Sequence, residues 1–257
     1  MNKESWVNPL LLNYEYFFIL KKLRGNMKLI HFDNEDILDS KAMKDHEEYV
    51  ENDGHNSYSI DEVLQFNKHK TLFFWDSFKK LYKALEILRE HKILHMNINS
   101  SSILYSRDTF EARICNFNNS INNNSINTIH YEDNKYLPFE YHLLCYIKEK
   151  DNLKEEDIDI IIQKSMYRLS EKMMKKHEEV ARRYINKCIH LDNCEIKDSI
   201  MNVMETWDIY SLAVHYLYYI TKYNEKHNKI NIIINRCEAI ISSDPEDRLT
   251  IGETAFA

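Results

Sequence analysis

Glycine is scarce in this chain. The 257 residues include three glycines, Gly25, Gly54 and Gly252, whereas proteins average roughly 7% glycine. A glycine-rich phosphate loop needs several glycines within about six residues of one another, and no two of these three lie that close together. We therefore expect the chain to lack a loop of this class for cradling a nucleotide phosphate.

Long apolar runs and an excess of basic residues are missing as well. No stretch approaches the ~18 consecutive apolar residues of a membrane span, so we expect no membrane association. The formal net charge is -7. That balance argues against a nucleic-acid or anionic-membrane binder, because counterion release needs a concentrated basic face.

Cysteine occurs in an odd number, five, and no secretory signal precedes the chain's first apolar patch. We predict reduced thiols in a cytoplasmic or nuclear protein. The spacing of Cys188, His190 and Cys194 matches no common zinc pattern, so we expect no metal site there. The five cysteines are Cys115, Cys145, Cys188, Cys194 and Cys237.

The hydrophobic patterning is mostly helical, and the length suits one large domain or two small lobes. Apolar residues recur at helical spacing over 10–24 and, more strongly, over 71–92. In the second helix the predicted apolar face consists of Leu72, Phe74, Phe78, Leu81, Leu85 and Leu88. Ser59-Ile60-Asp61-Glu62 predicts a capping box that opens a short helix. Residues 28–32 predict a short strand, and the acidic segment 34–58 predicts mostly loop.

Two short segments after the helix predicted at 71–92 carry a family resemblance. The stretch from His95 to Ser102 resembles the catalytic loop of protein kinases, H-R-D-x-x-x-x-N, and Asn116-Phe117-Asn118 resembles the D-F-G motif. The positions of the catalytic base and the two metal ligands carry Asn97, Ser102 and Asn116. A carboxamide has nearly the shape of a carboxylate, but it cannot take a proton and binds hard cations poorly. The chain therefore resembles a pseudokinase.

Three later motifs follow in the order that kinases have. Leu137–Glu140 resembles A-P-E, Trp207–Ala213 resembles D-x-W-S-x-G, and Asp244–Thr250 resembles D-P-x-x-R-x-T. The resemblance implies that Glu140 pairs with Arg248. It also implies that Asp208 is buried near the backbone of the loop at His95 and Met96.

The resemblance implies an α+β, protein-kinase-like fold with a mostly helical large lobe. The small lobe, residues 1–55, is expected to be truncated, with Glu15 the closest candidate for its ion-pairing glutamate. The large lobe, 56–257, is expected to carry a helical insertion at about 145–203. Met96 and Asn99 replace the arginine and the lysine of the kinase catalytic loop.

The insertion has its own apolar pattern. From 153 to 190, apolar residues recur with a spacing close to the 4-3 alternation of a heptad face, which predicts one long amphipathic helix. Two interpretations are open. The helix packs on the large lobe, or it binds a protein partner. The pattern residues are Ile158, Ile162, Met166, Leu169, Met173, Val180, Tyr184 and Cys188.

The resemblance and its departures predict a catalytically inactive binding, scaffold or allosteric regulatory protein of a signalling pathway. In that case no cofactor is expected, Asn97 and Asn116 hold loops through their amides, and His95 and Phe117 stack in the core. One alternative is a divergent ATP- and Mg²⁺-dependent Ser/Thr kinase that recruits Glu132 or Asp133. A second alternative is a helical scaffold whose motifs are coincidental.

Overall fold

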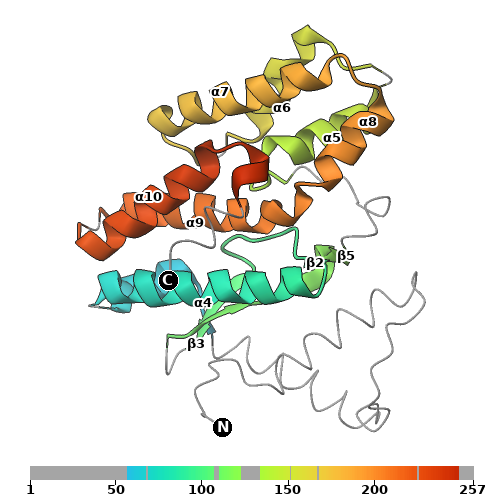
Figure 1. The fold of residues 1–257 in the computed structure, drawn as a ribbon. Coiled ribbons are helices and arrows are strands. Elements are labelled where there is room, and N and C mark those ends of the chain that lie inside the picture. The colour runs from blue at the N-terminus through green and yellow to red at the C-terminus, as the bar shows by residue number, and fades with distance from the viewer. Residues whose placement is uncertain are drawn as a thin grey trace, which may run out of the picture.

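The computed structural model describes residues 57–67, 69–106, 110–122, 134–150, 152–166, 168–224 and 226–248. Within these ranges the chain is α+β and mostly helical, with two small sheets (Figure 1). The helix expected at 10–24, the strand at 28–32, the small lobe at 1–55 with Glu15, and the residues Glu132 and Asp133 lie outside them.

The first two helices among the described residues form where the sequence predicts them. Helix α3 spans Ile60–Phe66 and α4 spans Lys70–Glu90. The Ser59 side chain accepts a hydrogen bond from the Glu62 amide while the Glu62 carboxylate accepts one from the Ser59 amide, so the capping box is confirmed. The buried face of α4 consists of Phe73, Phe74, Ser77, Phe78, Leu81, Tyr82 and Leu85.

Two small antiparallel sheets lie beside α4. One joins β1 (Ser57–Tyr58), β3 (Ile103–Ser106) and β4 (Ala112–Ile114), with Ile103 opposite Ile114. The other joins β2 (Ile93–Leu94) to β5 (Ile121–Asn122). The connection from β2 to β3 is the segment that resembles a catalytic loop.

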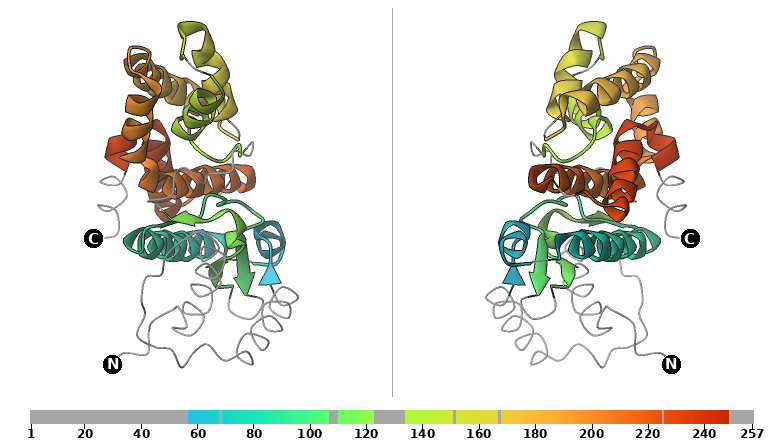
Figure 2. Two further views of the ribbon diagram at one scale, coloured as in Figure 1. Left: turned by 90° about the vertical axis from the view of Figure 1, so that its right-hand side faces the viewer. Right: turned by 90° about the vertical axis from the view of Figure 1, so that its left-hand side faces the viewer.

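The remaining helices form two further layers. Helices α9 and α10 lie between the α4 layer and a group made of α5, α6, α7 and α8, and Figure 2 shows this order from two sides. Helix α9 is buried on nearly all sides, which marks it as the central helix. The bounds are α5 Phe139–Glu149, α6 Ile158–Lys164, α7 Glu171–Cys188, α8 Asn193–Met201, α9 Trp207–Tyr223 and α10 Asn228–Ser242, with short 3-10 helices at Phe117–Asn119, Glu155–Asp157, Met204–Thr206 and Pro245–Asp247.

The prediction of one continuous helix over 153–190 is wrong, because the chain breaks between α6 and α7. Ser165 ends α6 and its hydroxyl donates to the Ile162 carbonyl (2.8 Å), while the Ser170 side chain caps the start of α7. Between them Arg168 adopts a left-handed φ of 62°, which a helix interior excludes. The apolar 4-3 pattern thus continues across the turn between α6 and α7, so the pattern alone did not reveal the break.

The apolar face of α7 is internal. Met173, Val180, Tyr184 and Cys188 are all buried, and α7 contacts α5, α6 and α10. For α7 the apolar face packs against other helices of the chain, as the first of the two interpretations requires, and it is therefore not exposed for a protein partner.

The described residues contain neither a membrane-spanning helix nor a disulfide. No helix in the described ranges is long and apolar enough to cross a membrane. No disulfide joins any two of the cysteines in the described part of the chain, and all five are in that part.

Replacing Met173 with Glu tests the internal packing of α7. Met173 is 1% exposed, and a carboxylate forced into that site has no partner, so we expect a loss of about 3 kcal/mol or more in unfolding free energy. Ile160→Glu is the matched control, because Ile160 on α6 is 53% exposed and should cost under about 0.5 kcal/mol. Urea denaturation measures both. Equal effects would contradict the buried face.

Candidate functional site

The loop after β2 is anchored by one buried carboxylate. Asp208, in the first turn of α9, accepts hydrogen bonds from the His95 amide (2.6 Å) and the Met96 amide (2.9 Å). This expected contact is confirmed. Burial raises the pKa of Asp208 to about 6, against the opposing effect of the two amide donors. Met96 itself has a left-handed φ of 63°, so the carboxylate holds a backbone turn that few non-glycine residues adopt.

His95 links the loop to the segment that follows β4. Its ring lies edge-on to Phe117 with a centroid separation of 4.7 Å, which confirms the expected contact. Its Nε2 donates to the Cys115 carbonyl (2.9 Å). Burial lowers the pKa of His95 to about 4, so the imidazole is neutral at physiological pH and acts here as a core side chain.

The polar residues of the loop hydrogen-bond to one another. Asn99 Nδ2 donates to Asn97 Oδ1 (2.6 Å), and Ser102 Oγ accepts from the Asn99 amide (2.9 Å) while lying 2.5 Å from the Asn97 carbonyl. Asn99 Oδ1 in turn accepts from the Ser101 amide and hydroxyl. The amide oxygen at the position of the catalytic base is thus engaged in holding the loop, as expected for Asn97.

The position that matches the second metal ligand behaves differently. Asn116 is exposed and has a left-handed φ of 61°, a conformation in which asparagine is enriched. The short 3-10 helix at Phe117–Asn119 follows it. Asn118, the third residue of the D-F-G-like motif, lies in that 3-10 helix. Ser102, at the position of the other metal ligand, is fully buried. The two positions therefore differ in their access to solvent.

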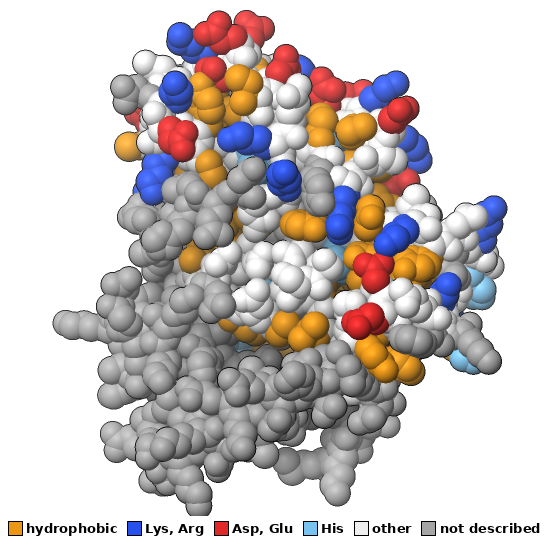
Figure 3. Space-filling model, turned by 180° about the vertical axis from the view of Figure 1, so that it is seen from behind, with side chains coloured by type: hydrophobic (Ala, Val, Ile, Leu, Met, Phe, Trp, Pro, Cys, Tyr) orange, Lys and Arg blue, Asp and Glu red, His pale blue; other side chains and the backbone are white. Residues whose placement is uncertain are grey.

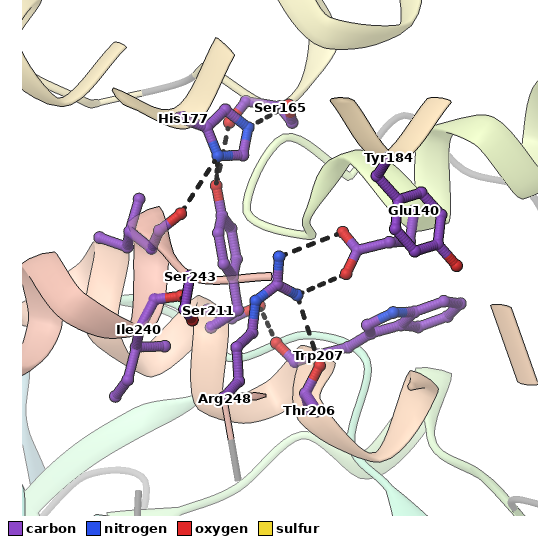
Figure 4. A network of polar contacts seen from close by, with 12 residues as sticks. Glu140, Ser165, His177, Tyr184, Thr206, Trp207, Ser211, Ile240, Ser243 and Arg248 are labelled. Carbon is purple, nitrogen blue, oxygen red and sulfur yellow. Dashed lines mark hydrogen bonds and ion pairs between the residues drawn. The ribbon is translucent and has the colours of Figure 1, made fainter. Parts of the chain in front are cut away.

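A second cluster lies where the first turn of α5 meets the last described residues. Arg248 donates to both carboxylate oxygens of Glu140, at 2.5 and 3.4 Å (Figure 4), and both side chains are 0% exposed. The expected pair is confirmed across 108 positions of sequence. Burial raises the pKa of the Glu140 carboxyl, and the adjoining guanidinium opposes that shift.

The start of α9 connects the two clusters. Arg248 also donates to Thr206 Oγ1 (3.4 Å), two residues before the Asp208 carboxylate that anchors the loop. The Arg248 guanidinium lies over the rings of Tyr210 (5.0 Å) and Phe139 (5.8 Å). One helix terminus thus positions both the loop and the ion pair.

His177 extends this cluster to the break between α6 and α7. Its Nε2 lies 2.7 Å from Ser165 Oγ, and its Nδ1 lies 3.4 Å from the Ile241 carbonyl and 3.5 Å from the Tyr210 hydroxyl (Figure 4). Burial lowers the pKa of His177 to about 4. Sequence analysis missed this residue, although its position four residues after Met173 places it on the apolar face of α7.

Neither a candidate metal site in the described residues nor, on the face drawn in Figure 3, a surface patch of one charge accompanies these two clusters. In the part of the chain that the structure describes, no group of three or more His, Cys, Asp or Glu side chains could hold a metal ion. Figure 3 shows both signs of charge interspersed over the helices α5 to α8 on the face it presents. The site therefore consists of a loop of amides and hydroxyls anchored by the buried Asp208 carboxylate, and of the buried ion pair between Glu140 and Arg248.

Removing one partner of the Glu140–Arg248 pair should strand a buried charge. We expect Arg248→Met to cost about 3–5 kcal/mol of unfolding free energy and the double variant Glu140→Leu/Arg248→Met to recover a large part of it. Arg182→Met is the control, since Arg182 pairs with Asp159 and Glu178 on the exposed surface and should cost under about 1 kcal/mol. Urea denaturation measures the unfolding free energy of each variant. Equal losses in Arg248→Met and Arg182→Met would count against a structural role for the buried pair.

Buried histidines should make the fold acid-labile. Burial lowers the pKa of His95 and His177 to about 4 and that of His215 to about 3. The unfolded chain then binds more protons than the folded chain, so stability falls as pH drops from about 6.5 to about 4. The raised pKa values of Asp208 and Glu140 work in the opposite direction, but three histidines outnumber two acids.

Substitution of His215 tests the contribution of a single histidine to this pH dependence. Both ring nitrogens of His215 have no hydrogen-bond partner among the described residues, so His215→Leu removes a titrating group without breaking a known bond. We expect a shallower slope of unfolding free energy against pH between about pH 4 and 6.5, by up to one proton. An unchanged slope would contradict the buried neutral ring.

No protein-family model, no curated protein and no solved structure matches this chain.

Proposed function

We propose that this chain is a pseudokinase: a protein-kinase-like fold that has lost its chemistry and acts as a binding, scaffold or regulatory protein in signalling. The observation that carries the proposal is the hydrogen bond from Asn99 Nδ2 to Asn97 Oδ1 (2.6 Å) in a loop anchored by Asp208. The kinase-like support of the loop is retained, and the residue at the position of the base contributes to that support.

Long-range contacts support the kinase-like fold. Asp208 meets the loop amides across 113 and 112 positions, and Glu140 meets Arg248 across 108 positions. No rule of helix or turn formation brings such residues together. They were expected from the family resemblance alone, and coincidental motifs offer no reason for both contacts to form.

The chemistry of the loop supports inactivity. Phosphoryl transfer depends on positioning and electrostatic stabilisation, and a single polar group contributes about 10²- to 10⁴-fold to such reactions. Here an amide stands at the position of the base and at one metal position, and a buried hydroxyl stands at the other. The three glycines of the sequence also leave no glycine-rich loop. Losses of this kind together leave no measurable transfer, even with allowance for non-additivity.

The proposal places the protein in the cytoplasm or nucleus, with a protein partner and with no ATP or metal cofactor. The reduced thiols expected from the odd cysteine count support that location. The partner does not reach the face of α7, because that face is buried.

Mg-ATP tests the proposal. A ligand at ~1 mM with a dissociation constant of ~10 µM adds about 2.7 kcal/mol of stability, so binding would raise the melting temperature visibly. We expect no shift with Mg-ATP and no incorporation of labelled phosphate into protein substrates. A Mg²⁺-dependent shift together with transfer that Asn97→Ala abolishes would overturn the proposal.

The divergent-kinase alternative has a distinct signature in the same assay. Transfer that survives Asn97→Ala but is lost in Glu132→Gln or Asp133→Asn would establish a recruited carboxylate and an active enzyme. Nucleotide binding without transfer would keep the protein inactive but would restore ATP as a ligand.

A further inference from the structure

The turn between α6 and α7 has an unusual sequence for a break between two helices. It spans residues 165–170, Ser-Met-Tyr-Arg-Leu-Ser, and contains neither glycine nor proline, the residues that most often end a helix. The apolar pattern also runs through it, because Met166, Leu169 and Met173 follow one another at spacings of three and four residues. The composition of this segment is therefore compatible with a continuous helix.

The backbone of the turn is strained at one residue. Arg168 has a φ of 62°, a left-handed conformation that is unfavourable for a residue with a Cβ atom. Two backbone bonds of the turn join residues only three apart, from the Ser165 amide to the Ile162 carbonyl (3.0 Å) and from the Leu169 amide to the Met166 carbonyl (3.3 Å). A continuous helix would replace these bonds with bonds between residues four apart and would return Arg168 to a right-handed φ.

Side-chain contacts keep the turn closed in the single chain. The Ser170 hydroxyl accepts a hydrogen bond from the amide three residues later (3.4 Å), and Ser165 Oγ lies 2.7 Å from His177 Nε2 (Figure 4). The Arg168 guanidinium lies 4.2 Å from the Tyr218 ring centroid. Opening the turn gives up these contacts and relieves the left-handed residue, so the two conformations are in competition.

The turn joins two halves of the described chain that pack closely on each other. Helices α4, α5 and α6 precede it, and α7 to α10 follow it. Across this boundary α4 packs on α9 and α10, and α5 packs on α7 and α8. The ion pairs Asp61–Lys222 (2.7 Å) and Glu140–Arg248 also cross it. Two copies can form the same contacts with each other if each supplies one half, because the contacting surfaces are unchanged.

We propose that the α6/α7 turn is a hinge through which two copies of this chain exchange halves. In the exchanged dimer the turn opens, and one helix runs from the start of α6 at Ile158 to the end of α7 at Cys188. The half before the turn in one copy packs on the half after the turn in the other copy. A short strained hinge invites such an exchange, and the free-energy difference is confined to the turn and to the freedom lost on association, since all other contacts are remade. The inference uses none of the loop residues, so it is independent of the proposed loss of kinase chemistry.

Refolding at two concentrations tests for the dimer. Exchange requires the two halves to separate, so the dimer should form during refolding from urea, when the halves are still apart. We expect size-exclusion chromatography with light scattering to find a dimer after refolding at about 500 µM and a monomer after refolding at about 1 µM, because association depends on protomer concentration. A monomer at both concentrations would overturn the proposal.

Proline at position 171 separates the closed turn from the continuous helix. Glu171 is exposed and is the first residue of α7, and Ser170 before it is extended, with φ -70° and ψ 159°. A proline fits this position in the closed turn, but it is excluded from the interior of a helix that continues through residue 171. We expect Glu171→Pro to keep the melting temperature of the monomer and to reduce the dimer fraction at least about tenfold. The matched control Glu171→Ala should keep the dimer. A dimer that persists in Glu171→Pro would overturn the hinge.

Cross-linking shows which copy supplies each half of the dimer. Isotope-labelled heavy chains and light chains are refolded together, and a carbodiimide then joins lysines to the carboxylates that they contact. We expect cross-linked Asp61–Lys222 peptides that combine one heavy and one light chain. The control pair is Lys172–Glu238 (3.2 Å), whose two residues both follow the turn, so its cross-linked peptides should come from a single chain. A dimer in which both pairs cross-link only within one chain would be a surface contact and would overturn the exchange.

Discussion

The buried ion pair between Glu140 and Arg248 is the contact on which the arrangement of the helices depends. It joins the first turn of α5 to the end of the described chain, and Thr206 brings the start of α9 into the same cluster. A buried pair adds little net stability over an apolar core, but either charge alone would be costly. The pair therefore acts as a constraint on topology: these three segments must meet for the fold to be complete.

The same helix terminus supports a loop whose conformation is held by uncharged side chains and one buried carboxylate from outside the loop. Asp208 fixes the backbone at His95 and Met96, and the ring of His95 contacts Phe117. These contacts need shape, hydrogen bonds and burial but no charged side chain within the loop itself. A loop can thus keep its conformation after its carboxylates are replaced by amides, because an amide oxygen accepts a hydrogen bond as a carboxylate does.

Sequence reasoning succeeded where the constraint was local or was inherited through a motif. The capping box at Ser59 and the extent of α4 follow from spacing, and the pairing of Glu140 with Arg248 followed from the resemblance. It failed where periodicity was ambiguous. The apolar pattern of the insertion passes through the break at Ser165 and Ser170, since a turn can keep apolar residues in phase. Periodicity also placed Leu72 on the buried face of α4, but this side chain is 48% exposed, because packing against α10 decides which edge of α4 is covered. His177 was missed because its partners come from three other segments, the end of α6, α9 and α10, which no local pattern specifies.

The separation of Glu140 from Arg248 has a consequence for synthesis on the ribosome. At about 5–20 residues per second, the 108 positions between them imply that Glu140 leaves the ribosome roughly 5–20 s before its partner. Throughout that interval α5 can form, but its first-turn carboxylate has no cation to bury against, and burial of the uncompensated charge is unfavourable. The helices α5 to α8 are therefore expected to pack against α9 and α10 only after Arg248 has left the ribosome. Until then the nascent protein remains partly folded.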